Sequence, residues 1–482
     1  MDVQVKPQSV HAAITNDQVS AAVADRLTEF CGEVVGKIEA LVATGLKATT
    51  MLELENGLQS SLLELGRRIV EWLLGAIEPE LDEMPGAVKH KGRSYRRLAE
   101  KTMRHGVVTR FGKVSIRRAV YRAGRAGKSI YPLEIAMGLD HGFTPAAADM
   151  IGKQFAATGS SQARTLDAIK ERTGDSVGIG RLRKLVGSLS GSMEPYRQAC
   201  QVEKLTNWID QARKLKQSIV LSVSRDGVSL GIAPCGIFEM ASVATISVLS
   251  AGKRLGTVYL GRTPEENQQT LSEQLTSLLK ETLRSCGDRL PEVVYVTDAG
   301  KVETAFWKNV LRKFYVDGKR IKIHRVVDYY HAAERLTKVA DALKLSADKR
   351  SQWLGHARGL LLEPGGHGRV LRSISSMEQL YGYKKSAAKE ANEAERYLRR
   401  YGRFMDYANM RDQNFPIGSG VVESACKQIV SERLKLSGMR WKQAGAQTTI
   451  TLRCLLLSGI WNAVYNRLIQ SKSTVSDLML AI

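Results

Sequence analysis

Paired cysteines are the first feature that this sequence lacks. Its six cysteines lie at positions 31, 200, 235, 286, 426 and 454, and no two of them form a Cys-x-x-Cys pair. This spacing excludes the usual zinc knuckle and gives no sign of a disulfide framework. A reducing, cytoplasmic compartment is therefore what we expect.

Long apolar segments are also missing. No apolar run reaches the roughly 18 residues that a membrane-spanning helix needs. The first 16 residues lack the apolar centre of a secretory signal peptide. We therefore expect no membrane partner and no export.

Acidic residues are scarce relative to basic ones. The 482 residues include 71 Lys and Arg but only 49 Asp and Glu, which gives a net charge of +22. Residues 89–128 alone hold 14 basic residues and a single acid, Glu100. An excess of this size attracts polyanions, of which nucleic acid is the commonest.

The basic region also has the pattern of β-strands. Val114, Ile116, Val120 and Tyr121 suit strands, and arginines stand between them. A solvated basic hairpin is the alternative, but the charge density favours contact with DNA phosphates. The expected contact residues are Arg96, Arg97, Arg110, Lys113, Arg117, Arg118 and Arg122.

Four regions flank or precede the expected core. Residues 1–84 contain leucines at helical spacing and predict a helical region that serves oligomerisation. Residues 85–140 form the basic, β-containing DNA-binding region, and residues 461–482 a C-terminal helix or tail. Residues 141–215 predict helices in a helix-turn-helix arrangement, although such pairs often serve packing alone. The second helix would present Arg181, Arg183 and Lys184 to DNA.

Residues 216–460 have the sequence pattern of strands followed by alternating helices and strands. Strands are expected near 218–223, 240–249 and 256–260, and then a helix, a strand, a helix and a strand ending at 327. This order is that of an α/β ribonuclease-H-like core. The charged residues 331–412 predict a helical insertion within it.

Three acids stand at the ends of these elements. Asp226 follows the first expected strand, Asp298 follows the fourth, and Glu423 begins a helix after the insertion. Carboxylates on a rigid core can hold two Mg²⁺ or Mn²⁺ ions, the cations that promote phosphoryl transfer on DNA. Each acid also has a structural explanation, as a turn residue, a helix cap or a partner of the helix dipole.

The sequence around Glu423 resembles a known family. Residues 416–441, with Gly418, Gly420 and Glu423, closely resemble bacterial insertion-sequence transposases of the Kra group, which are related to Mutator-like transposases. Thr297-Asp298-Ala299-Gly300 and the Asp-x-x-His of residues 328–331 are similar to two further motifs of these proteins.

The resemblance implies a catalytic, metal-binding triad of Asp226, Asp298 and Glu423. It further implies double-stranded DNA partners, namely terminal inverted repeats and a target, and a homodimer or larger assembly. A bacterial cytoplasm, close to the nucleoid, is the implied location.

Residues near the triad have two explanations each. Asp328 is a further metal ligand or a helix cap, and His331 a phosphate or Asp328 partner or a core histidine. Basic residues after Glu423 either hold the DNA end or form a solvated face, and Trp441 stacks on a base or belongs to the core. The candidates for DNA contact are Lys427, Arg433, Lys435, Arg440 and Trp441.

Taken together, the sequence predicts a DNA transposase that cleaves and transfers strands with the help of divalent metal. Two alternatives stay open at this point. One is a catalytically silent DNA-binding protein derived from a transposase, and the other is a structure-specific nuclease on the same core.

Overall fold

The computed structural model describes residues 15–125, 127–157, 159, 161–233, 237–476 and 480–481. The chain divides into two compact units, a first unit of residues 1–193 and 462–482 and a second unit of residues 194–461. The boundary at 193 lies inside helix α6 (Ile179–Lys214), so the predicted region 141–215 is divided between the units. Within the described ranges, no helix has the length and apolarity that a membrane span needs.

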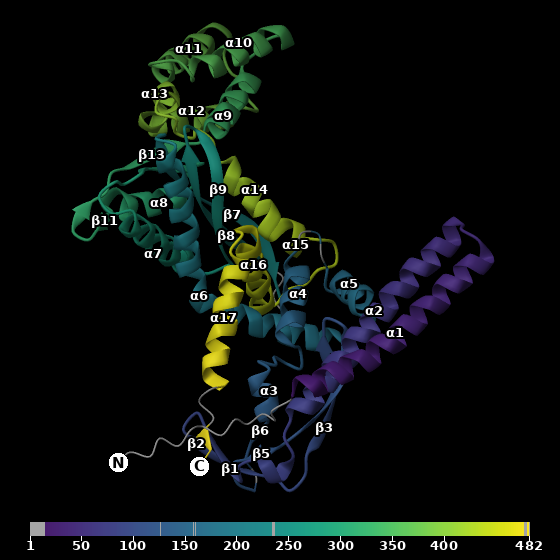
Figure 1. Cartoon of the computed structure of the whole chain (residues 1–482). Coiled ribbons are helices and arrows are strands. Elements are labelled where there is room, and N and C mark those ends of the chain that lie inside the picture. The colour runs from purple at the N-terminus through teal and green to yellow at the C-terminus, as the bar shows by residue number, and fades with distance from the viewer. Residues whose placement is uncertain are drawn as a thin grey trace. The chain divides into compact units, whose positions relative to one another are not determined.

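The first unit contains a helical hairpin within the helical region predicted for residues 1–84, of which residues 1–14 lie outside the described residues. Helix α1 (Asn16–Thr44) is followed by α2 (Ala48–Ile77) (Figure 1). Thr15 starts α1 with a capping box, in which its hydroxyl and Gln18 satisfy each other's backbone amides. An ion pair between Arg68 and Glu29 joins the two helices.

The predicted basic strands form a small sheet and a hairpin. The sheet has the order β14-β1-β2-β5-β6, and the separate hairpin pairs β3 with β4. Val107, Val114 and Ile116 of the hairpin are buried against Leu74 of α2. The strands are β1 (Ala87–His90), β2 (Arg93–Arg97), β3 (Thr102–Thr109), β4 (Gly112–Arg118), β5 (Tyr121–Arg122), β6 (Ser129–Ile130) and β14 (Leu480–Ala481).

Helices complete the first unit. The pair predicted as a helix-turn-helix is present as α5 (Gln162–Thr173) and α6, but α6 is one helix of 36 residues rather than a short one. Gly174, in the left-handed conformation, ends α5. Helix α17 (Trp461–Ser476) reaches this unit, where Tyr465 donates a hydrogen bond to the Pro145 carbonyl (2.6 Å). The other helices are α3 (Pro132–Ala136) and α4 (Pro145–Ala156).

The second unit is built on a five-stranded sheet of order β13-β10-β7-β8-β9. Strand β7 pairs antiparallel with β8 and parallel with β10, and β10 pairs parallel with β13. The predicted order of strands and helices is confirmed. The strands are β7 (Ile219–Ile232), β8 (Ile237–Ser250), β9 (Lys253–Arg262), β10 (Glu292–Thr297) and β13 (Ile323–Val327), with a small hairpin of β11 (Tyr315–Val316) and β12 (Lys319–Arg320) before β13.

Alternate residues of each central strand enter separate cores, because side chains of a strand point to opposite faces. Val293 and Tyr295 of β10 pack with α7 (Gln269–Ser285) and α8 (Lys301–Asn309). Val294 and Val296 pack with helices of the insertion. Figure 1 shows α7 and α8 on one side of the sheet and α14 on the other.

The predicted insertion at 331–412 is helical, as expected. It gathers at one end of the sheet (Figure 1) and fixes the ends of two strands. Tyr397 donates to the Asp298 carbonyl (2.6 Å), and Tyr407 donates to the Val327 carbonyl (2.9 Å). The helices are α9 (Tyr329–Ala342), α10 (Ala347–Leu360), α11 (Gly366–Tyr381), α12 (Ala388–Tyr401) and α13 (Tyr407–Asp412).

The chain then returns to the far end of the β7–β8 hairpin. Leu230 of β7, Val243 of β8 and Ile450 are buried together in a core that the last helices of this unit complete. These elements are α14 (Gly420–Cys426), a π-helical turn at Lys427–Ser431, α15 (Glu432–Leu434) and α16 (Gln443–Leu457).

Candidate active site

Three neighbouring strands carry an aspartate to the same level of the sheet. Val223 of β7 is paired with Tyr295 of β10, and Asp226 and Asp298 each stand three residues further along. Thr297 of β10 is paired with Val327 of β13, so Asp328 is level with Asp298. Because neighbouring strands lie about 4.8 Å apart, this register brings all three carboxylates to one region.

Asp226 does not follow its strand, contrary to the prediction. Strand β7 continues to Ile232, and Asp226 pairs with Val243 of β8 inside the ladder. The Asp-Gly pair is therefore not a turn. Val228, Leu230 and Ile232 keep the alternation of the strand and contribute to a core, which explains the longer ladder.

The environment of Asp226 disfavours its negative charge. Burial raises the pKa of this carboxyl, and the charges of Asp298 and Glu423 raise it further. A hydrogen bond from the Gly227 amide (2.7 Å) and one from the Cys426 thiol oppose the shift. The three acids of the predicted triad are thus close enough for their charges to interact.

Glu423 enters the site from the first turn of α14, as predicted. Its side chain is 48% exposed, and its Oε1 lies 2.8 Å from the hydroxyl oxygen of Ser419, the residue before the helix. The single proton of that hydroxyl is shared between Glu423 and Asp328. A carboxylate in a first helical turn is favoured by the helix dipole. Ser419 is a residue that the sequence interpretation did not single out.

Asp328 is fully buried, and its two oxygens are both engaged. Oδ1 accepts from the His331 amide (2.9 Å), which makes Asp328 the cap of α9. Oδ2 accepts from the amide of Ser419 and from its hydroxyl (2.6 Å). Burial alone would raise the pKa of Asp328, but its contacts with His331 and Ser419 outweigh burial and lower the pKa to about 2. Of the two expected roles, the cap is therefore present.

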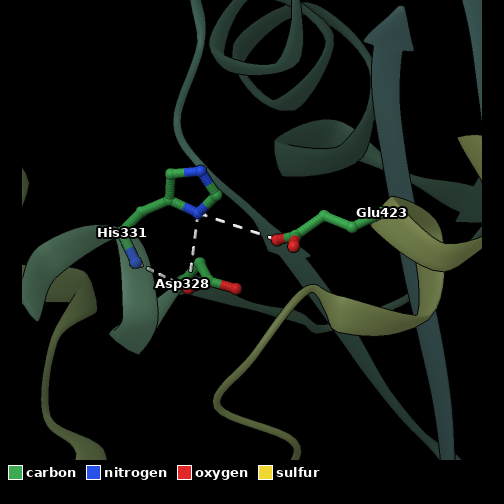
Figure 2. A group of neighbouring side chains, drawn as sticks. All are labelled: Asp328, His331 and Glu423. Atoms are coloured by element: carbon green, nitrogen blue, oxygen red, sulfur yellow. Dashed lines mark hydrogen bonds and ion pairs between the residues drawn. The ribbon is translucent and has the colours of Figure 1, made fainter. Parts of the chain in front are cut away.

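His331 lies between the two acids, as Figure 2 shows. Its Nδ1 is 3.4 Å from Asp328 Oδ1 and 3.8 Å from Glu423 Oε1. The contact with Asp328 has the distance of an ion pair but lacks the angle of a hydrogen bond. Asp328 first, and then the charges of Asp298 and Glu423, raise the pKa of His331 to about 9 against desolvation. The imidazole is therefore a cation at neutral pH in the metal-free protein.

This charge predicts a pH dependence of stability. A raised pKa stabilises the fold fully below the ordinary value of 6.5, and the effect is lost as the pH rises to about 9. At about 1.4 kcal/mol per unit, reduced for the 31% exposure of the side chain, the loss is roughly 1–2 kcal/mol. Urea unfolding of the metal-free protein between pH 6 and 9.5 measures it. His331→Gln should flatten the decline, whereas His356→Gln, at an exposed position of α10, should leave it unchanged.

A fifth carboxylate, which the sequence interpretation missed, lies in the same region as Asp226, Asp298, Asp328 and Glu423. Glu303 of α8 is 8% exposed, and burial followed by the charge of Asp298 raises its pKa. Glutamates in first turns are common, so the sequence carried no signal beyond its spacing from Asp298.

Three of the residues predicted to contact DNA are buried, and a fourth, Arg181, is half-buried. Arg118 is buried, ion-paired with Glu134 and stacked on the Tyr131 ring. Arg181 donates to the carbonyls of residues 141 and 142. Arg433 and Trp441 are buried against each other, with Arg433 Cζ 5.3 Å from the centre of the Trp441 ring. The prediction of Arg118, Arg433 and Trp441 as DNA contacts is corrected, because these side chains are buried in the cores. Arg181 stays a predicted contact, because its side chain is half-buried.

The remaining predicted contacts stay accessible. Arg97, Lys113 and Arg122 are half-buried, and Arg97 donates to the Met84 carbonyl. The exposed ones are Arg96, Arg110, Arg117, Arg183, Lys184, Lys427, Lys435 and Arg440.

The donor set fits hard divalent cations. Asp226, Asp298 and Glu423 offer carboxylate oxygens, which Mg²⁺ and Mn²⁺ prefer. Among the described residues, these three are not a group whose ligand atoms all lie within 4.8 Å of one another. Asp328, His331 and Glu423 have ligand atoms within 4.8 Å of one another. Both oxygens of Asp328 already accept hydrogen bonds. The cluster of Asp328, His331 and Glu423 is therefore better suited to positioning Glu423 than to binding a metal ion.

Comparisons with known proteins add no assignment. No protein-family profile matches the chain, and no curated protein matches it. The functional assignment therefore depends on the sequence pattern and on the geometry described above.

Proposed function

We propose that this protein is a DNA transposase with a ribonuclease-H-like catalytic core. The observation that supports this most is the convergence of Asp226, Asp298 and Glu423 from three elements that are far apart in the sequence. Burial raises the pKa of Asp226, and the charges of Asp298 and Glu423 raise it further. The resemblance of residues 416–441 to insertion-sequence transposases favours the same activity.

In this proposal the three carboxylates hold two Mg²⁺ or Mn²⁺ ions. Ions bound there supply positive charge that activates an oxygen nucleophile and neutralises the departing oxygen of the DNA backbone. The protein contributes a preorganised frame. Ser419 and His331 fix the Glu423 carboxylate, and Asp328 holds both of them in place.

The proposed partners are the terminal inverted repeats of the element and a target duplex, bound by a dimer or larger assembly in a bacterial cytoplasm. The net charge of +22 and the exposed arginines of the β-strand region favour a polyanionic partner. Two repeats match a symmetric protein assembly.

End joining distinguishes this function from that of a nuclease. We expect purified protein, Mg²⁺, a labelled end fragment and a supercoiled plasmid to give joined product, because a site of this kind accepts a DNA 3′-hydroxyl as nucleophile as readily as water. The end fragment is taken from the DNA that flanks the gene, where the proposal expects terminal inverted repeats. A 3′-deoxy end should abolish joining. If a sample with demonstrated paired ends gives cut DNA but no joined product, the protein is a nuclease and not a transposase.

Exposed arginines of the first unit should set the salt dependence of binding. Arg96→Gln and Arg117→Gln should each lower the slope of log affinity against log salt by about 0.9, because each removes a phosphate contact. Gel shifts at four salt concentrations measure the slope. Arg254→Gln, at an exposed position of β9, has the same charge change and serves as the control. Equal slopes in all three variants would mean that Arg96 and Arg117 remain in solvent.

A further inference from the structure

Glu303 is a buried acid that the proposed triad does not use. It stands in the first turn of α8, five residues after Asp298, with 8% of its surface exposed. Acids are rarely buried to this degree unless a partner compensates the charge. A neighbouring group that compensates the charge of the Glu303 carboxylate is therefore expected.

Helix capping does not account for it. A glutamate at the third helical position usually accepts a hydrogen bond from the amide of the cap residue, here Gly300. That amide donates instead to Asp298 Oδ1 (2.9 Å). The Glu303 carboxylate receives a hydrogen bond from its own amide. Among the described residues, the Glu303 carboxylate has no other hydrogen-bond partner and no ion-pair partner.

The Glu303 carboxylate faces Asp298 across a space that only glycine leaves open. A Cβ atom on Gly300 would lie 2.3 Å from Glu303 Oε2 and 3.3 Å from Asp298 Oδ1. Gly300 has a φ of −52°, so it is not needed for its backbone conformation. Its missing side chain allows the two carboxylates to flank one small volume.

The surrounding charges are mostly of the same sign. Asp298 and Asp226 repel the Glu303 carboxylate, and Arg225 attracts it. The Arg225 guanidinium, however, donates to Gln268 (2.6 Å) and Ser272 (3.0 Å). Buried carboxylates that repel one another are stabilised by a shared cation.

We propose that Glu303 is a further carboxylate ligand of the divalent cation held by Asp298. The inference rests on the proposed function, since it assigns a fourth acid to the same metal site. Mg²⁺ takes six oxygen ligands, of which one or two are usually carboxylates, so a cation held by Asp298 has a place for a second carboxylate. Glu303 would thus set the affinity of the site for metal.

The test uses the full-length, metal-free protein and Mn²⁺ alone as the probe. Glu303→Gln keeps the shape and removes the charge, and Glu266→Gln is the control at an exposed position of the same unit. Free Mn²⁺ is followed by its paramagnetic resonance signal during titration, and melting temperatures are taken with and without Mn²⁺. We expect Glu303→Gln to bind Mn²⁺ about 10–100-fold more weakly and to gain less in melting temperature from the ion.

The metal-free melting temperature separates a ligand from a structural residue. Removing a charge from a group of repelling carboxylates should leave this temperature unchanged or raise it. A lower value with unchanged Mn²⁺ affinity would overturn the inference, as would unchanged affinity alone. Gly300→Ala provides a second route if the first variant does not fold, because its Cβ displaces the Glu303 carboxylate without removing a charge; unchanged Mn²⁺ affinity there overturns the inference too.

The outcomes also distinguish this inference from the proposed function. If the wild-type protein binds Mn²⁺ and joins DNA, but Glu303→Gln binds Mn²⁺ with equal affinity, only the assignment of Glu303 as a ligand is wrong. If the wild-type protein neither binds Mn²⁺ nor cuts DNA, the proposed function is wrong as well.

Discussion

Replacing Asp298 by asparagine is expected to abolish DNA cleavage while leaving DNA binding intact. Asp226→Asn and Glu423→Gln should behave in the same way. Each change removes one negative charge from the metal-binding group and preserves the shape of the side chain. Loss of several kcal/mol of transition-state stabilisation corresponds to a rate decrease of at least about 10³-fold.

Cleavage of a labelled repeat and gel shift on the same DNA measure the two properties together. Asp288→Asn, in the turn before β10, is a control with the same charge change outside the site. A variant of the three that cuts at the wild-type rate would not be a member of the triad. A variant that loses binding and cleavage together would point to a folding defect, which its melting curve would reveal.

Replacing Asp328 by alanine is expected to destabilise the second unit by about 3–5 kcal/mol. The change removes a buried carboxylate and leaves the amides of His331 and Ser419 without their acceptor, whereas the Ser419 hydroxyl keeps Glu423 as its acceptor. It also removes the anion that holds His331. Glu423 would lose the orientation that Ser419 and His331 give it.

Urea unfolding measures the loss, and the pH dependence identifies its origin. Because the folded-state pKa of Asp328 is lowered to about 2, its contribution is present above the ordinary value of 3.8 and disappears as the pH falls through 2. The difference in the free energy of unfolding between wild type and Asp328→Asn should therefore become smaller below pH 4. Asp341→Ala, which breaks an exposed pair with Arg350 in the same helix region, should cost less than about 1 kcal/mol. A comparable loss in both variants would contradict the positioning role of Asp328.

The sequence predicted the order of the core elements better than their ends. Strand β7 is the clearest case, since Asp226-Gly227 has the composition of a turn but lies within a ladder of 14 residues. The alternation of Val228, Leu230 and Ile232 was visible, yet its meaning depended on β8 and on the core that these residues enter. Pairing between strands decides such cases, and one sequence does not contain it.

Basic side chains show a second limit. Arg117 and Arg118 are neighbours in one strand, and alternation sends the first to solvent and the second to Glu134 and Tyr131. Arg433 is fully buried against Trp441. Charge density indicates a polyanionic partner for the chain as a whole, but burial decides which arginines are free to meet it.

Within the candidate site, the acids at strand ends were predictable and their supporting residues were not. Asp298 and Asp328 follow apolar strands, which marks them in the sequence. Ser419 and Glu303 have no such mark. Their roles arise from contacts across the insertion or across a single glycine, as with Ser419 and Asp328, which are 91 residues apart.

The discontinuity of the first unit has a consequence for biosynthesis. Helix α17 and strand β14 belong to the same unit as β1, but the ribosome makes them after the whole of the second unit. A chain that stops at Trp461 therefore contains every residue of the second unit but lacks these two elements of the first. A product released early would therefore carry the carboxylates without the finished unit that holds the basic strands. Full-length translation is then a precondition for joining the two in one molecule.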